Sequence, residues 1–268
     1  MKLGEITKGA AWALVTGAGS GIGRCYAQQL AALGYNLILA GINVSTIEAT
    51  RTLCEVHGVE VRTITIDLAR AEASQELFES VCTQNIAIDV LINNAGIFSF
   101  LDVLKTPRER IERIILLHTT TATLNCQLFA KQMVQRGVRG YILNMSSYSL
   151  WMPFPGLSLY SASKAYLRSF SVAFAKEVRE HNIRVTAVCP AGVATDLYGL
   201  PSHWQQIGRK IGVLISPDSC ARRGLHALWR GRRCIVPDWW NRLWIPLCKM
   251  LPMCVLRPIR RQTMKFQK

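Results

Sequence analysis

Short apolar runs alternate with longer amphipathic segments along the first 190 of the 268 residues. The runs have the length of buried strands and are rich in Val, Ile and Leu, whereas the longer segments repeat apolar residues at helical spacing. Strands that alternate with helices in this way predict a parallel sheet covered by helices on both faces. The predicted strands are residues 12–15, 37–40, 61–66, 90–92, 141–143 and 185–188, with a last short strand at 234–236, and the predicted helices are residues 22–33, 46–57, 74–83, 108–136 and 160–181.

Composition excludes several classes of protein. Half of the residues are hydrophobic, which excludes a disordered chain, and the length suits a single domain over residues 1–268. The first ten residues lack the apolar segment of a signal peptide, and the apolar stretch 244–256 is interrupted by two prolines and is too short for a membrane span. The nine cysteines form no CxxC pair, so we expect core residues of a cytoplasmic protein and no metal site.

A glycine-rich turn follows the first predicted strand. Residues 16–23 are Thr-Gly-Ala-Gly-Ser-Gly-Ile-Gly, and a helix is predicted to begin within this segment. Glycines let the backbone approach a ligand closely, and the N–H groups at a helix N-terminus favour an anion. The order of strand, glycine turn and helix predicts a site for the pyrophosphate of a dinucleotide, with an ordinary glycine-rich turn as the alternative.

Four motifs occur in the order and spacing of one family. They are the turn at 16–23, Asn-Asn-Ala-Gly at 93–96, Ser147, and Tyr-Ser-Ala-Ser-Lys at 160–164. Together they resemble the short-chain dehydrogenase/reductase family over about residues 8–200. The resemblance implies a three-layer, doubly wound α/β Rossmann fold with a seven-stranded parallel sheet. It also implies an oxidoreductase that transfers hydride between a nicotinamide cofactor, NAD or NADP, and a ketone or secondary alcohol.

Tyr160 and Lys164 are four residues apart on a predicted helix and therefore share one face. A phenol has a pKa near 10 in water, and a nearby ammonium is expected to lower it toward the range useful for proton transfer. The resemblance gives Tyr160 the proton-transfer role and Lys164 the support of the phenolate and of the cofactor ribose. It places Ser147, thirteen residues before Tyr160, on the substrate oxygen, although Ser146 is adjacent and could be confused with it.

His118 departs from the family pattern. Many members carry an Asn at this position, where it supports a water-linked proton relay to the Lys, and Asn125 lies two helical turns too late to replace it. Three interpretations stay open: His118 takes over the relay, the helix is shifted, or the relay is changed. Histidine can pass protons near neutral pH, but a core histidine whose hydrogen bonds are satisfied is equally consistent with the sequence.

Cofactor-binding residues follow from the same resemblance. In this family, an acid after the second strand would bind a ribose 2′-hydroxyl and an Arg there would favour a 2′-phosphate. This chain has neither, because residues 41–43 are Gly-Ile-Asn. Ser20 is uncharged, and Arg24 is expected to point along its helix. The missing acid makes NADP the expected cofactor in preference to NAD. The expected contacts are Gly17, Ser20, Gly21, Ile22, Gly23, Asp67, Leu68, Asn94, Ala95, Gly96, Tyr160, Lys164, Pro190, Gly192, Val193 and Thr195.

The resemblance also places a substrate lid at about residues 191–215. Its apolar side chains are expected to shape the pocket, with a lid packed on its own body as the alternative, and an apolar pocket favours an apolar ketone over a sugar. These side chains are Leu197, Tyr198, Leu200, Trp204, Ile207, Ile211 and Val213 in the lid, joined by Trp151, Met152, Pro153 and Phe154.

Basic charge gathers toward the C-terminus. The net charge is +15, and residues 222–268 hold twelve Lys and Arg and a single Asp, with Trp229, Trp239, Trp240 and Trp244 among them. Trp beside cations suits a lipid interface, so a basic, Trp-rich extension over about 237–268 is expected to contact membranes peripherally. The alternative is a solvated surface with a few core Trp. A basic patch also attracts acyl-CoA phosphates or, without specificity, nucleic acid, although the sequence contains no nucleic-acid-binding module.

The functional hypothesis is the reduction of an apolar or lipid-like ketone of the 3-oxoacyl or 3-ketosphinganine type. Two alternatives remain. One is a dehydrogenase of small hydroxy compounds or steroids, and the other is a dinucleotide-binding regulator without catalytic activity. The family resemblance further implies a homo-oligomer, either a dimer or a tetramer.

Overall fold

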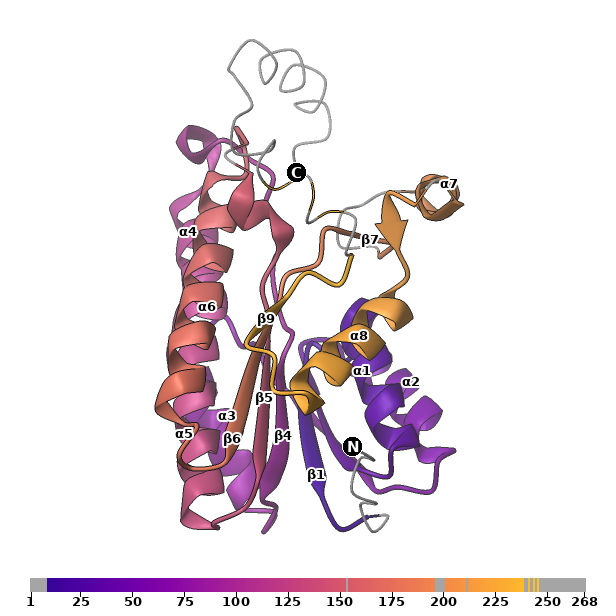
Figure 1. Ribbon diagram of the computed structural model, residues 1–268, viewed down its shortest axis with the longest axis vertical. Helices are drawn as coiled ribbons and strands as arrows, with labels where there is room; N and C mark the ends of the chain where they lie inside the picture. The colour runs from indigo at the N-terminus through magenta and orange to yellow at the C-terminus, as the bar shows by residue number, and fades with distance from the viewer. Residues whose placement is uncertain are drawn as a thin grey trace.

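A parallel sheet forms the centre of the protein. The computed structural model describes residues 9–152, 154–195, 201–210, 212–238, 241, 243 and 245. Within them, seven strands pair in parallel in the order β3-β2-β1-β4-β5-β6-β9, which confirms the predicted sheet (Figure 1). The strands are β1 (Trp12–Thr16), β2 (Asn36–Gly41), β3 (Val61–Thr65), β4 (Ile88–Asn93), β5 (Gly140–Met145), β6 (Ile183–Val188) and β9 (Cys234–Ile235).

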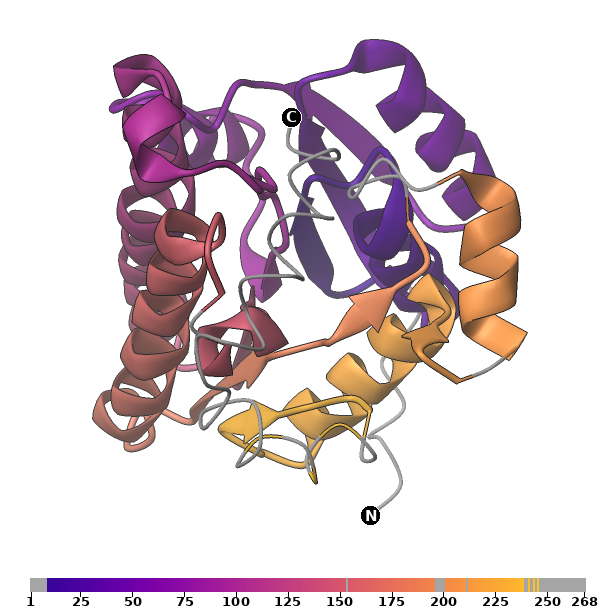
Figure 2. The same cartoon turned by 90° about the horizontal axis from the view of Figure 1, so that it is seen from above.

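Helices cover both faces of the sheet, as expected for three layers (Figures 1 and 2). One face carries α1 (Gly21–Ala32), α2 (Val44–Glu55) and α8 (Pro217–Trp229), and the other carries α3 (Ala73–Cys82), α4 (Arg108–Ile115), α5 (Ala122–Gln135) and α6 (Ser158–Glu177). Among the described residues, no helix has both the length and the apolar character needed to cross a membrane.

Alternation along the strands divides the core in two. In β1, Ala13 and Val15 pack with the α1 side, whereas Leu14 packs with the α5 side. Leu37 and Ile38 of β2 divide in the same way. Successive strand residues point to opposite faces, so a strand buried on both faces is apolar at every position. This is the physical origin of the continuous apolar runs in the sequence.

The predicted helix boundaries lie within two residues of the observed ones except at two places. The segment 108–136 is not one α-helix, because a π-helical turn, Leu116–Thr121, separates α4 from α5. Helix α6 ends at Glu177, four residues before His181, because the chain must turn back to begin β6. The expected stops at Gly34 and Gly58 are confirmed, since both adopt the left-handed conformation that favours glycine.

The lid stands above the carboxyl edge of the sheet (Figure 1). It contains a small parallel pair, β7 (Gly192–Val193) and β8 (Leu214–Ile215), and the helix α7 (Ser202–Lys210). Trp229 does not join a basic surface, because its ring stacks on Tyr35 and packs edge-on against Tyr141. Several predicted lid and tail residues lie outside the described residues: Pro153, Leu197, Tyr198, Leu200, Ile211, Trp239, Trp240, Trp244 and the segment 246–268.

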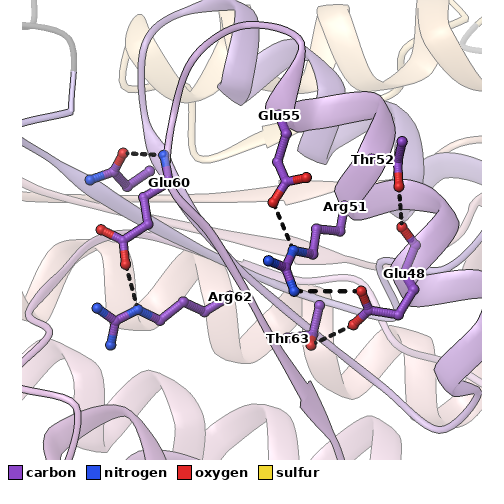
Figure 3. A network of polar contacts seen from close by, with 8 residues as sticks. Glu48, Arg51, Thr52, Glu55, Glu60, Arg62 and Thr63 are labelled. Carbon is purple, nitrogen blue, oxygen red and sulfur yellow. Dashed lines mark hydrogen bonds and ion pairs between the residues drawn. The ribbon is translucent and has the colours of Figure 1, made fainter.

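The outer edge of the sheet, at β3, is covered by charged pairs. Figure 3 shows Arg51 of α2 between Glu48 and Glu55, while Arg62 of β3 binds Glu60 at 2.6 Å. All these side chains are more than a third exposed, so water screens each pair and its contribution to stability is small. Their main effect is to place charge on an edge strand that would otherwise attract another chain.

The prediction that the cysteines are core residues holds for four of the seven in the described part of the chain, whereas Cys25 and Cys234 are half-buried and Cys82 is exposed. Every cysteine in the described part of the chain is free. Cys54, Cys126, Cys189 and Cys220 are fully buried, as predicted. Cys82, at the end of α3, is exposed, because it occupies the solvent side of that helix.

Candidate active site

A cavity of about 750 Å³ is lined by residues from the loops that follow β1, β4, β5 and β6, at the carboxyl edge of the sheet. Ligands of open parallel sheets bind at this edge, where the strand order reverses. Most residues predicted from the sequence line the cavity. They are Gly17, Ser20, Gly21, Ile22, Asp67, Leu68, Asn94, Ala95, Gly96, Ser147, Tyr160, Lys164, Pro190, Val193 and Thr195.

The glycine turn is shaped for close approach. Gly17 has a φ of +64°, which favours glycine, and a Cβ on it would lie 2.9 Å from Cα of Ala95. A Cβ on Gly23 would collide with the carbonyl oxygen of Gly17, so Gly23 maintains the tight turn although it does not itself line the cavity. Thr16 joins the turn to the next loop, since its hydroxyl oxygen accepts hydrogen bonds from the N–H groups of Asn94 and Ala95 at 3.0 and 3.1 Å.

This cradle fits a dinucleotide. Gly17 and Gly23 leave no room for a Cβ, so the turn packs closely against Asn94 and Ala95 and leads directly into the N-terminus of α1, where backbone N–H groups favour a pyrophosphate. Asp67, at the far end of the cavity, receives the Ala69 N–H at 2.9 Å and the Arg113 guanidinium at 3.0 Å. Burial acts to raise the pKa of Asp67, but these bonds outweigh it and the net pKa is lowered. Asp67 is therefore an acceptor at neutral pH.

Three candidate catalytic side chains meet at the opposite end of the cavity. Tyr160 and Lys164 lie on α6 and Ser147 follows β5, and the hydroxyls of Tyr160 and Ser147 are hydrogen bonded. The Lys164 ammonium lies 5.8 Å from the centre of the Tyr160 ring and donates to the Met145 carbonyl oxygen at 2.9 Å. Ser146 is turned the other way and donates to the Lys164 carbonyl oxygen at 2.7 Å, so Ser147 is the serine that faces the tyrosine.

The expected lowering of the Tyr160 pKa is not found in the free chain. Burial raises the pKa of Tyr160 to about 12, against a smaller opposing effect of the bond to Ser147. Burial also lowers the pKa of Lys164 to about 8. The ammonium is bound to a backbone carbonyl rather than to the phenol oxygen, so loss of water outweighs the attraction between the two groups. Tyr160 therefore keeps its proton at neutral pH.

His118 lies behind these residues, outside the cavity lining, in the π-helical turn. It is 1% exposed. Its Nε2 accepts the Ile97 N–H at 3.0 Å, and its Nδ1 lies 2.9 Å from the Ser163 hydroxyl. Burial, with a smaller contribution from Lys164, lowers its pKa well below 6.5. Of the interpretations left open by the sequence, this geometry agrees with a neutral core histidine whose hydrogen bonds are satisfied.

Asn125 lies away from the cavity, as its spacing predicts. Its amide donates to Asn93 at 3.1 Å, Asn93 donates to Asn144 at 2.9 Å, and Asn144 donates to Ser171 at 2.8 Å. These four buried side chains join α5, β4, β5 and α6 below the site. Their bonds fix the carboxyl ends of β4 and β5, which carry the cavity residues that follow.

Several lining residues have no strong sequence signal. Phe98 packs edge-on against Tyr160 with 5.1 Å between ring centres, and Arg113 and Gln205 reach the cavity from α4 and α7. The other lining residues that were not predicted are Gly41, Ile42, Ile66, Ala69, Ile97, Leu117, Met145, Ser146, Ala194 and Pro217. Phe98 follows the Asn-Asn-Ala-Gly motif by two residues, which is the one signal that could have indicated it.

The lid expectation is wrong for three residues. Trp204, Ile207 and Val213 are 55%, 43% and 61% exposed and do not line the cavity. Trp151 and Met152 pack in a small cluster with Tyr148 rather than in the cavity. Phe154 pairs with Phe100, 6.1 Å between ring centres. Gly192 is also outside the lining, because β7 places it against Leu214.

Comparison with known proteins gives a consistent family. Residues 11–206 match the family model described as short chain dehydrogenase. The probable oxidoreductase EphD of Mycobacterium tuberculosis is 32% identical over 183 residues, which are 68% of this chain and 31% of EphD. A very-long-chain 3-oxoacyl-CoA reductase of Coccidioides immitis is 36% identical over 223 residues, 82% of this chain and 62% of that protein. The chain therefore matches less than two thirds of the length of these two relatives.

A solved structure shares the fold over nearly the whole length. The short-chain dehydrogenase from Sphingobium yanoikuyae in complex with NADPH superposes with a TM-score of 0.76 at 28% identity and covers 95% of both chains. The family model spans the glycine turn, the Asn-Asn-Ala-Gly motif, Ser147 and the Tyr160–Lys164 pair, which are the residues gathered around the cavity. The chain belongs to the short-chain dehydrogenase family.

Proposed function

We propose that this chain is an NAD(P)-dependent oxidoreductase that interconverts a ketone and a secondary alcohol, acting chiefly as a reductase of apolar ketones. The observation that carries the proposal is the meeting of Ser147, Tyr160 and Lys164 at one end of a cavity whose other end is the glycine turn. A regulator without activity would not need a buried ammonium beside a buried phenol, because burying an unpaired charge is costly.

The residues divide the chemistry between them. A nicotinamide cofactor, when bound along the glycine turn, supplies the hydride. Tyr160, which keeps its proton at neutral pH, donates that proton to the carbonyl oxygen of the substrate. Ser147 holds the same oxygen by a hydrogen bond and stabilises its developing negative charge. Lys164 provides positive charge beside the phenolate that remains.

The walls at the catalytic end favour an apolar substrate. Phe98 lines the cavity against Tyr160, and Ile97 and Leu117 are also in the lining, so these walls offer mainly hydrocarbon surface. The relative from Coccidioides is named a very-long-chain 3-oxoacyl-CoA reductase, and a structural neighbour from Comamonas testosteroni at 26% identity is named a bulky-bulky ketone specific alcohol dehydrogenase. These names support a ketone with long or bulky apolar groups over a small hydroxy compound.

NADPH is the proposed reductant. The residues that line the cavity beside the turn and after β2 are Ser20, Gly41 and Ile42, and none of them carries a carboxylate to bind a ribose 2′-hydroxyl. The Asp67 carboxylate, which follows β3, is already paired with Arg113. Arg24 does not simply point along its helix, because its guanidinium folds back to donate to the Gly19 carbonyl oxygen at 2.5 Å. The dissociation constants of NADPH and NADH, measured by fluorescence, test the preference, and tighter binding of NADH would contradict it.

Replacement of the candidate proton donor tests the catalytic proposal. Tyr160→Phe should lower the turnover of NADPH oxidation with a panel of apolar ketones by about 10²- to 10⁴-fold, because the carbonyl oxygen loses its proton donor. Tyr166→Phe is the matched control, since Tyr166 is an exposed phenol on the same helix. Equal turnover of the Tyr160→Phe variant and the wild type would refute the assignment.

Membrane contact is a separate proposal. On α7, Trp204 and Ile207 are exposed beside the exposed cations Arg209 and Lys210, a combination suited to an anionic lipid surface. The basic extension after Pro237 is expected to add to this contact. Flotation with anionic liposomes, comparing the full chain with a truncation after Pro237, tests the role of the extension. Equal flotation of the two proteins would exclude it.

Self-association is proposed through the long helices. Tyr166, Phe170 and Phe174 form a stacked row along α6, with ring centres 6.1 and 5.3 Å apart, and none of the three is fully buried. Such a row on an outer helix suits contact with a second copy of the chain. Light scattering after size exclusion distinguishes a dimer or tetramer from a monomer.

A further inference from the structure

We infer that His118 is a positioning residue, a neutral imidazole with its proton on Nδ1 that ties the cavity loop at Ile97 to the helix carrying Tyr160 and Lys164. The inference rests on the proposed function for its consequence, but the state of the imidazole can be measured on the free chain.

The hydrogen bonds around His118 determine where its proton lies. The Ile97 N–H can only donate, so Nε2 must accept and carries no hydrogen. The Ser163 hydroxyl donates its one hydrogen to the Tyr160 carbonyl oxygen at 2.8 Å. Its oxygen is then left to accept, so Nδ1 donates to it across 2.9 Å. Both ring nitrogens are thus used, and no atom of the imidazole is left to pass a proton.

The surroundings of the ring oppose a second proton. The titratable groups placed against it are Tyr160, at 5.8 Å between ring centres, and the Lys164 ammonium, and both belong to α6. Protonating Nε2 would break the bond to Ile97 and put two cations side by side in a dry site. His118 therefore cannot act as a proton relay without losing its contact with the loop.

The anchored loop is the floor of the cofactor cleft. Residues 94–98 line the cavity, and Gly96 lies so close that a Cβ on it would be 3.2 Å from Nε2 of His118 and 3.4 Å from Nζ of Lys164. The π-helical turn at Leu116–Thr121 carries His118. His118 holds this loop in place relative to α6, because its ring is hydrogen bonded to Ile97 on one side and to Ser163 of α6 on the other.

Two substitutions separate the contacts of the ring. The carboxamide of Gln reaches as far from the backbone as Nε2, whereas that of Asn reaches only as far as Nδ1. His118→Gln can therefore still accept from Ile97, and His118→Asn can only keep the bond to Ser163. We expect His118→Asn to raise the dissociation constant of NADPH about three- to tenfold, and His118→Gln to restore it to within twofold of the wild type. The control is His181→Asn. His181 is an exposed histidine in the turn between α6 and β6, and its variant should bind NADPH like the wild type.

Nitrogen-15 spectra of the five histidines measure the imidazole directly, with the His118 signals identified by their loss in His118→Asn. The expected result is an Nδ1–H tautomer that does not titrate between about pH 5.5 and 8.5, the range in which an ordinary imidazole changes its charge. An Nε2–H tautomer, or titration in that range, overturns the inference. Equal NADPH binding by the Asn and Gln variants also overturns it. A wild-type chain that binds no NADPH refutes the proposed function, while the tautomer still decides the state of the imidazole.

Discussion

Replacing the buried lysine of the site should leave the protein at least as stable as the wild type at neutral pH and remove a characteristic pH dependence of its stability. Lys164 is 4% exposed, and its pKa is lowered to about 8 because burial disfavours the ammonium. In the unfolded chain this side chain has its usual pKa of 10.5. The folded protein therefore carries an unfavourable charge whenever the pH is below 8, and Lys164→Met removes it.

The magnitude follows from the shift. A change from 10.5 to about 8 corresponds to about 3 kcal/mol of lost stability below pH 8, at about 1.4 kcal/mol per pH unit. Methionine also leaves the Met145 carbonyl oxygen without its donor, which costs about 1–3 kcal/mol. The variant should therefore equal the wild type or exceed it by up to about 2 kcal/mol at pH 7.5. It should lose the catalytic function at the same time.

The pH dependence is the sharper measurement. Between pH 8 and 10.5 the unfolded chain holds the lysine proton and the folded chain does not, so the free energy of unfolding rises with pH. Urea unfolding gives the free energy of unfolding of the wild type and of Lys164→Met at about pH 7.5 and about pH 9.5. From the lower to the higher pH, the free energy of unfolding of the wild type should rise by about 2 kcal/mol relative to that of the variant. Because the two proteins share all other titrating groups, the effects of those groups cancel in this difference.

A second lysine serves as the control for this experiment. Lys176 is exposed on the same helix, so Lys176→Met should show no such change with pH. A difference between wild type and Lys164→Met that stays constant between the two pH values would refute the reasoning, because the ammonium would then not be desolvated.

Two further substitutions test the turn and the amides below the site. Gly23→Ala places a Cβ against the Gly17 carbonyl oxygen and 2.5 Å from the Asn94 amide, so we expect more than about tenfold weaker NADPH binding by titration calorimetry and a loss of about 1–3 kcal/mol in stability. Unchanged binding would show that the turn does not need its tight form. Asn144→Ala removes the acceptor of Asn93, and urea unfolding should show a loss of about 2–4 kcal/mol, whereas a loss below about 1 kcal/mol would mean that water replaces the amide.

Local sequence patterns were enough to predict the central sheet and most of the helices around it. The apolar runs matched all seven strands of the central sheet, since a strand buried on both faces must be apolar throughout, whereas the short pair β7 and β8 was not predicted. The glycine turn at Gly17 could be interpreted in the same way, because the backbone conformation there depends on the residue itself. The pair Tyr160 and Lys164 needed only the period of a helix to share one face.

Contacts between distant segments required the tertiary structure. The apolar character of Trp204 predicts burial, yet only the packing of α7 shows that it faces solvent. Trp229 looked like part of a basic surface, but it is partly buried and packs against the core, stacked on Tyr35, which lies almost two hundred residues earlier in the chain. Arg113 of α4 was not predicted to line the cavity, and only the folded structure brings it to Asp67, which follows β3.

Charge in the site shows the same division. The sequence alone determined that Tyr160 and Lys164 follow one family pattern and that His118 departs from it, because spacing along a chain is a local property. It could not determine their protonation, since desolvation depends on everything packed around a group and a proton on His118 depends on partners from two other segments. Residue types and their order thus fix which groups are present, and the packing of the folded chain decides which of them carries a proton.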